Sequence, residues 1–355
     1  MSIWLDRRLL DLFHIETPIL LAPMAGSGGS AMAIAVAKAG GLGSLPCASV
    51  SVEKTTEEVA LFRAAVTAPV NLNFFAHQPR TPTDEDSRRW LARLAPYFSE
   101  FKVDPASLTA AGGRAPFDDA MCRMVEALKP EVVSFHFGLP PEELLERVRK
   151  TGAKIIAAAT TVAEGRWLAE RGVDAVIAQG SEAGGHRGNF LTEDMATQPG
   201  LFALVPQLAD ALSIPVIAAG AVADGRGMAA ALTLGASAVQ IGTAYLLSDE
   251  SISVPVHKAA LKHARDDNTA VTNVLTGRPA RGVINRIMRE IGPLSPDALP
   301  FPLAGGALGP MRAATEKLGQ GDFQPLWSGQ AGALAREGSA ESITRNIADT
   351  AASLL

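Results

Sequence analysis

Short apolar segments alternate with helical patterns along most of the chain. The apolar segments are continuous rather than interrupted by polar residues at every second position. Such runs are typical of strands buried on both faces of a parallel sheet. Nearly all of them are separated by stretches whose apolar residues recur at helical spacing. We count eight strand candidates, at residues 18–24, 41–47, 69–75, 131–138, 154–161, 174–180, 215–220 and 237–243.

Eight such units predict an α/β fold with a parallel sheet. Their number favours a closed (β/α)8 barrel (a TIM barrel) over an open doubly wound sheet, which stays the alternative. A dinucleotide-binding version of the open sheet is disfavoured, because no G-x-G-x-x-G sequence follows the first strand candidate.

Two regions depart from the repeat. Residues 77–117 form an insertion between the third and fourth strand candidates, for which a dimer contact is one possible role. Residues 249–316 follow the eighth strand and are irregular and rich in proline and glycine. They predict a smaller lid or substrate lobe above the active-site end of the barrel. The barrel would then comprise residues 1–248 and 317–355, the latter ending in a helix that closes the ring.

Composition narrows the class of protein. The 355 residues are 47% hydrophobic, and their net charge of −5 comes from well-mixed charges without a basic block, which argues against nucleic acid as a partner. No signal peptide and no run of about 20 apolar residues is found, so a membrane is not expected either. Cys47 and Cys122 show no metal or redox spacing and fit a reducing, cytoplasmic setting. The six histidines form no paired metal-binding spacing, and no metal is predicted.

Glycine-containing turns end the seventh and eighth strand candidates. Gly220 and Ala221 precede a predicted helix near Asp224, and Gly242 and Thr243 end the next strand. Barrels commonly bind phosphate with free backbone N–H groups at these two positions. Tight turns without a ligand are the alternative.

Polar side chains sit at the ends of other strands. Asn73, Gln179 and His136 follow apolar runs, and a side-chain amide suits the edge of an imide-like ring. Each of these side chains could instead form hydrogen bonds with backbone groups of a loop and have a purely structural role. The segment Ala22, Pro23 and Met24 ends the first strand with small residues, against which a planar ligand can lie.

The segment GSEAGGHRG at residues 180–188 contains the strongest candidate for chemistry. Histidine titrates near neutrality, so His186 can take a proton from a weak carbon acid. Gly184 and Gly185 would let the backbone approach a flat cofactor, over which His186 reaches a substrate. The alternative is a solvated loop histidine beside Glu182 and Arg187.

Several segments resemble one known family. They read PILLAPMAG, FHFGLP, AQGSEAGGHRG, PVIAAGAVADGR and AVQIGTAYLLSDES, and TGRPARG and LWSGQ follow towards the C-terminus. Together they resemble the nitronate monooxygenases, formerly called 2-nitropropane dioxygenases, in the family's order and at about its spacing. GSEAGGH alone is shared with the related FMN-dependent enoyl-acyl-carrier-protein reductases.

The resemblance implies a barrel with a lid lobe that holds FMN without a covalent bond. It implies oxidation of alkyl nitronates by O2 to a carbonyl compound and nitrite, through a one-electron flavin semiquinone route that needs no NAD(P)H. His186 matches the catalytic histidine, and His136 matches a second, substrate-side histidine. The FMN contacts carried over are Asn73, Gln179, Gly184, Ala221, Gln240, Ile241, Gly242 and Thr243, with Ala22, Pro23 and Met24 beside the isoalloxazine.

Two positions depart from the family pattern. Ala221 replaces a usual glycine, and its N–H is expected to reach phosphate if its φ is negative. The segment FPLAGGALGPMR at 301–312 lacks the tyrosine and lysine that the family often carries there, so a strongly anionic substrate is not expected. We predict an FMN-dependent nitronate monooxygenase. An NAD(P)H-dependent FMN reductase of the enoyl-reductase type, a flavin-free sugar-phosphate aldolase or isomerase, and a non-catalytic ligand carrier stay open.

Overall fold

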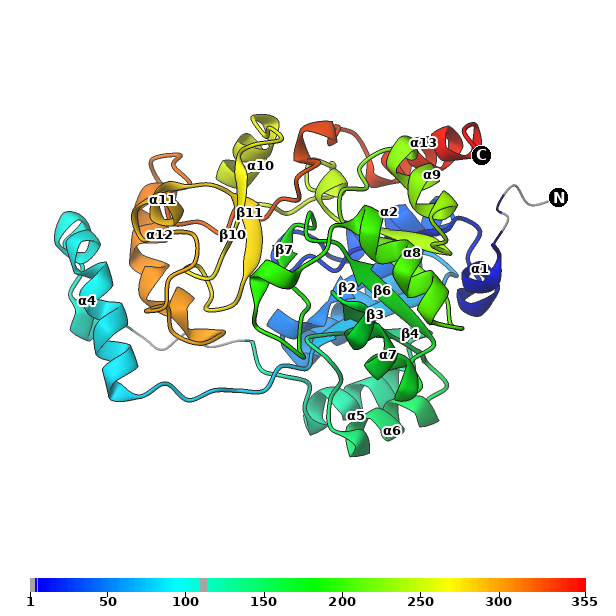
Figure 1. Ribbon diagram of the computed structural model, residues 1–355, viewed down its shortest axis with the longest axis horizontal. Coiled ribbons are helices and arrows are strands. Elements are labelled where there is room, and N and C mark those ends of the chain that lie inside the picture. Colours follow the sequence, from blue (N-terminus) through cyan, green and yellow to red (C-terminus); the bar gives the residue numbers. More distant parts are fainter. Residues whose placement is uncertain (1–3, 5, 109–113) are drawn as a thin grey trace.

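Eight parallel strands form the centre of the computed structural model, which describes residues 4, 6–108 and 114–355 (Figure 1). Their order is β1-β9-β8-β6-β5-β4-β3-β2. The eight predicted strands and the (β/α)8 barrel are confirmed. The strands are Ile19–Leu21 (β1), Gly43–Pro46 (β2), Val70–Phe75 (β3), Val132–His136 (β4), Lys154–Ala159 (β5), Ala175–Gln179 (β6), Val216–Ala219 (β8) and Ala238–Ile241 (β9).

The two outer strands of this order meet and close the ring. Leu20 and Leu42 form a parallel bridge, in which the N–H of Leu42 donates to the carbonyl of Ile19 at 2.9 Å. Every residue of β1, β6 and β8 is buried, as continuous apolar runs predict for strands enclosed on both faces.

Helices cover the outside of the barrel. The last of them, α13, packs against α2 and α9 and closes the outer ring as predicted. Over the described ranges we find no helix with the length and apolar character that a bilayer crossing requires. The helices around the barrel are α1 (Arg8–Phe13), α2 (Ser30–Lys38), α3 (Val52–Ala65), α5 (Asp119–Leu128), α6 (Glu142–Lys150), α7 (Val162–Glu170), α8 (Leu201–Ala211), α9 (Gly225–Thr233) and α13 (Ala340–Ala352).

A second hydrophobic core lies beside the barrel (Figure 1). It contains a three-stranded antiparallel sheet in the order β10-β11-β7, in which β7 is Gly185–His186 from the barrel. Its other elements are α4 (Asp84–Phe101), β10 (Thr269–Thr272), β11 (Ala280–Val283), α11 (Arg286–Glu290) and α12 (Gly309–Glu316). Leu261 of α10 (Pro255–Lys262) packs in a separate small cluster with Leu246, Leu247 and Ala335.

The insertion at 77–117 contributes α4 to this second core. Trp90 is fully buried, and its indole N–H donates to the carbonyl of Ala304 at 3.2 Å. The Tyr97 hydroxyl donates to Glu290 at 2.8 Å. Within the insertion, α4 therefore belongs to the second core, whereas Phe117 packs in the barrel core. Residues 109–113 lie outside the described residues. The predicted boundaries of the lid lobe, at residues 249 and 316, stay a prediction. The contacts of Trp90 and Tyr97 add α4 to that lobe.

Candidate active site

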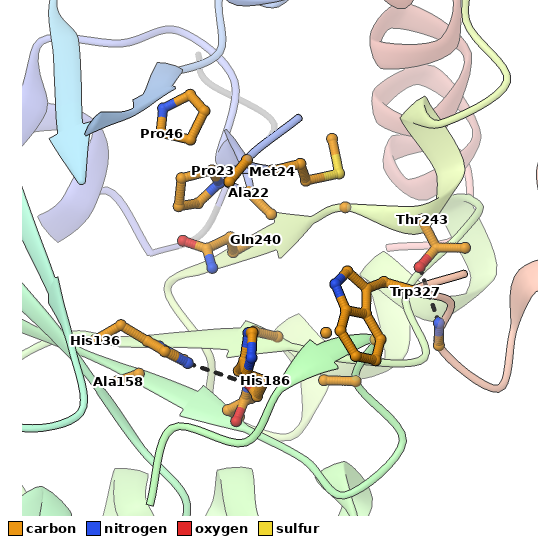
Figure 2. Close-up of a pocket in the computed structure, with 18 of the residues that line it drawn as sticks. Ala22, Pro23, Met24, Pro46, His136, Ala158, His186, Gln240, Thr243 and Trp327 are labelled. Carbon is orange, nitrogen blue, oxygen red and sulfur yellow. Dashed lines mark hydrogen bonds between the residues drawn. The ribbon is translucent and has the colours of Figure 1, made fainter. Parts of the chain in front are cut away.

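A cavity opens at the carboxyl ends of the barrel strands. In Figure 2, His136 and His186 lie on one side, with Trp327 beside His186, and Gln240 and Ala22–Met24 lie across from them. The candidate residues that line the cavity are Ala22, Pro23, Met24, Asn73, His136, Gln179, Gly184, Gly185, His186, Gly220, Ala221, Gln240, Gly242 and Thr243. Ile241 does not line it, because its side chain is buried in the barrel core.

His186 belongs to a short strand rather than to an open loop. Ala280 of β11 pairs with His186, and Arg281 pairs with Gly185, in antiparallel register. Gly184 comes so close to the segment after β11 that an added Cβ would lie 2.5 Å from the backbone nitrogen of Gly329. The glycine at 184 is therefore required by packing against the lid, a reason that the sequence prediction did not include.

One ring nitrogen of His186 is fixed by the lid. Its Nε2 lies 2.9 Å from the hydroxyl of Thr276, which itself donates to the carbonyl of Arg278 at 3.3 Å. Which of the two atoms donates depends on the tautomer of the ring, and in either case the contact holds the Nε2 edge of His186 towards Thr276. Burial, followed by the positive charge of Arg114, lowers the pKa of His186 well below 6.5. The ring is therefore neutral near pH 7 and able to accept a proton.

The main chain of His186 is held by two predicted site residues. Its carbonyl accepts from Nε2 of Gln179 at 2.9 Å and from Nε2 of His136 at 3.1 Å. Oε1 of Gln179 also accepts from the N–H of Gly188 at 2.7 Å. Both side chains therefore position the 185–188 segment, which is the structural role considered for them above. Burial lowers the pKa of His136 to about 4, so it donates as a neutral imidazole.

Two amide side chains have acceptor oxygens available at the cavity. Nδ2 of Asn73 donates to the Ser134 hydroxyl at 2.9 Å, which leaves Oδ1 unused within the described residues. Oε1 of Gln240 is buried and has no hydrogen-bond partner in the described part of the chain. Since buried polar atoms are nearly always paired, this oxygen indicates a bound donor.

The predicted phosphate cradle has unpaired donors. Within the described ranges, the backbone N–H groups of Ala221 and Thr243 donate to no protein acceptor. Asp224 caps α9 with its carboxylate, so the free donors lie in the turn before the helix. After β9 comes the short 3₁₀ turn Thr243–Tyr245. Such turns can still present N–H groups to an anion.

The expected negative φ of Ala221 is wrong. Its φ is +55°, in the left-handed region that disfavours residues with a Cβ, and it follows Gly220 at +116°. The backbone N–H of Ala221 therefore lies in a turn at the cavity whose conformation a glycine would adopt freely. The methyl group of Ala221 adds strain of about 1 kcal/mol.

An aromatic cluster next to the cavity escaped the sequence prediction, and Trp327 of this cluster lines the cavity itself. The Phe301 ring centroid lies 5.2 Å from that of His186 and 4.8 Å from that of His77, and Trp327 lies 5.5 Å from His186. Burial lowers the pKa of His77 to about 4. The cluster comes from segments far apart in the sequence, so no local pattern signals it. Among the described residues, no group of three or more His, Cys, Asp or Glu could hold a metal ion.

Comparison with known proteins finds relatives over nearly the whole chain. The sequence profile of the family described as Nitronate monooxygenase matches residues 6–349. The nitronate monooxygenase of Pseudomonas aeruginosa is 39% identical over 344 residues, which cover 96% of this chain and 98% of that protein.

Solved structures show the same relationship. The nitroalkane oxidase of Streptomyces ansochromogenes aligns over 98% of both chains with a TM-score of 0.88 and 37% identity. FabK from Thermotoga maritima aligns over 98% of this chain and 96% of its own, with a TM-score of 0.70 and 28% identity.

Proposed function

The chain belongs to the nitronate monooxygenase family and is an enzyme of that type, and from this premise we propose that it oxidises alkyl nitronates with O2 to a carbonyl compound and nitrite. We propose FMN, bound without a covalent link, as its cofactor. The observation that carries the proposal is the neutral His186, which lines the cavity and is held at Nε2 by the hydroxyl of Thr276. We assign its lone pair to Nδ1, with Thr276 donating to the carbonyl of Arg278.

The residues present fit a flavin phosphate and ring. The unpaired N–H groups of Ala221 and Thr243 would hold the phosphate. The orphaned Oε1 of Gln240 would accept from an N–H of the ring system, and Asn73 offers a second acceptor. The backbone at Ala22–Met24 lies across the cavity from His186 and would support the ring system (Figure 2). When bound, FMN supplies one-electron transfer between the nitronate and O2.

His186 has two possible tasks towards the substrate, and its hydrogen bonding favours one of them. With Nε2–H donated to Thr276, Nδ1 is the proton acceptor, so the ring can deprotonate the carbon next to a neutral nitro group. The aromatic rings of Phe301 and Trp327 exclude water from this face. A dry pocket keeps the imidazole in its neutral base form at pH 7, although it also lowers the affinity of the ring for that proton.

The proposal is tested on the purified protein. We expect a flavin absorption spectrum, release of FMN rather than FAD on denaturation, and O2 consumption with nitrite formation from ethyl nitronate and propyl-2-nitronate. A colourless protein that cannot be reconstituted with FMN contradicts the cofactor. A flavoprotein that is indifferent to both nitronates contradicts the reaction.

A second candidate is an NAD(P)H-dependent FMN reductase, because the motif at residues 180–186 resembles that of the enoyl reductases. Anaerobic mixing separates the two. Rapid bleaching of the flavin by NADPH, without bleaching by nitronates, favours the reductase, and the opposite pattern favours nitronate oxidation.

A further inference from the structure

The indole N–H of Trp327 is a polar group of the cavity that the proposed reaction does not use. Trp327 lines the same cavity as His186. Its ring centroid lies 5.5 Å from that of His186, and the two ring planes are inclined by 56°. In Figure 2 the indole stands beside His186, and its nitrogen is on the edge that faces Gln240 across the cavity. The ring therefore presents a hydrogen-bond donor to the cavity as well as an apolar surface.

This N–H has no acceptor within the protein. Over the described ranges, Nε1 of Trp327 donates to no protein group and is not among the fully buried polar atoms, so it is open to the cavity that the residue lines. Trp90 of the second core differs, because its indole N–H donates to the carbonyl of Ala304 at 3.2 Å. Since an indole N–H at an enclosed site usually finds a partner, that of Trp327 is available to a ligand.

Backbone contacts hold Trp327 in this position. Its carbonyl accepts from Nε2 of His257 at 2.8 Å, and its own N–H donates to the carbonyl of Pro325 at 3.0 Å. It also forms an antiparallel bridge with Gly282 of β11, where an added Cβ would lie 3.1 Å from Cε3 of the indole. The ring thus packs on bare backbone of β11, the strand that also pairs with His186. Donor and base are therefore fixed relative to each other.

We propose that Nε1–H of Trp327 donates to an oxygen of the substrate's nitro group while Nδ1 of His186 takes the proton from the neighbouring carbon. This inference rests on the proposed function. When the C–H bond breaks, its proton moves to Nδ1 and its electron pair forms the C=N bond of the nitronate. The negative charge then lies on the two nitronate oxygens. A fixed donor interacts more strongly with these oxygens than with a neutral nitro group, so it lowers the barrier to proton removal and strengthens nitronate binding.

The experiment removes the N–H and keeps the ring. Trp327→3-benzothienylalanine exchanges the N–H for sulfur in a ring of nearly the same shape, and Trp327→Phe is a second variant without a donor. Trp167→Phe is the matched control, because Trp167 lies on α7 outside the barrel, under the guanidinium of Arg171. For each FMN-loaded protein, kcat/KM is measured with nitroethane and with ethyl nitronate. The equilibrium binding of nitrate is measured as well, since its planar oxygens resemble those of a nitronate and it has no carbon to oxidise.

We expect both Trp327 variants to lose about tenfold or more in kcat/KM for the two substrates and in nitrate affinity, as for one hydrogen bond to a charged acceptor. Trp167→Phe should behave as wild type. Unchanged kcat/KM and nitrate binding in the benzothienylalanine variant overturn the proposal. A loss of FMN affinity without these changes also overturns it, because the N–H then serves the cofactor. If the wild type consumes no O2 with either substrate, the proposed function fails, while nitrate binding still decides the role of Trp327.

Discussion

Nε2 of His186 lies 2.9 Å from the hydroxyl of Thr276, so a residue of the lid orients the ring of a residue of the barrel. The same lid supplies β11, which pairs with the strand that contains His186. The orientation of the His186 ring thus depends on contacts between the barrel and the lid. This dependence yields the first prediction.

Replacing Thr276 with valine should lower kcat for nitroalkanes by about tenfold, the effect of one lost hydrogen bond worth ~1.4 kcal/mol. Valine keeps the shape of threonine but cannot accept from Nε2, so the ring loses its fixed tautomer. Steady-state kinetics on the FMN-loaded enzyme measures the effect, and Thr276→Ser is the matched control that keeps the hydroxyl. An unchanged kcat in Thr276→Val would show that the lid does not orient His186.

Replacing His186 with asparagine should remove the base. We expect oxidation of neutral nitroethane to fall by about 10²–10⁴-fold, whereas ethyl nitronate, which has already lost that proton, should be affected less. In the wild type, the lowered pKa of His186 keeps the base form dominant above pH 6.5, so the acidic limb of kcat/KM for nitroethane should lie below that pH. Equal losses for nitroethane and its nitronate would assign His186 to binding rather than proton transfer.

The sequence predicts the barrel well because the strands are fixed by local chemistry. Continuous apolar runs recur at regular spacing, and in a (β/α)8 barrel their carboxyl ends must converge. Asn73, His136 and Gln179 therefore line one cavity, as expected from their positions at strand ends.

The remaining features depend on contacts between distant segments. Thr276 is 90 residues from His186, and Phe301 and Arg114 reach the cavity only through the folding of the lid and the insertion. Neither periodicity nor motif spacing encodes such packing. The amide of Gln179 similarly donates to the backbone carbonyl of His186. Composition alone leaves open whether such an amide binds the loop backbone or a cofactor.

Replacing Ala221 with glycine should stabilise the protein. The φ of +55° strains an alanine, and glycine adopts it freely, so we expect the free energy of unfolding to rise by about 0.5–1 kcal/mol. Urea unfolding measures the change. Ala221→Val is the opposing variant, since a β-branched side chain is still less compatible with positive φ. If glycine lowers stability, the turn is not strained by the methyl group.

His136 should make stability depend on pH. Its pKa is about 4 in the folded protein, against 6.5 for the ordinary side chain, because burial disfavours the charged form. The unfolded chain therefore binds the proton first as pH falls. The stabilisation is fully present above pH 6.5 and is lost progressively towards pH 4.

The test compares the wild type with His136→Gln, which keeps a donor for the carbonyl of His186 but cannot titrate. Between about pH 7.5 and pH 5, the free energy of unfolding of the wild type should fall by on the order of 2 kcal/mol more than that of the variant. His77, His186 and His257, whose pKa values are also lowered by burial, titrate in both proteins, so most of their contribution cancels in the difference. Parallel pH profiles of the two proteins would mean that protonated His136 is accommodated in the fold, with its ring open to water.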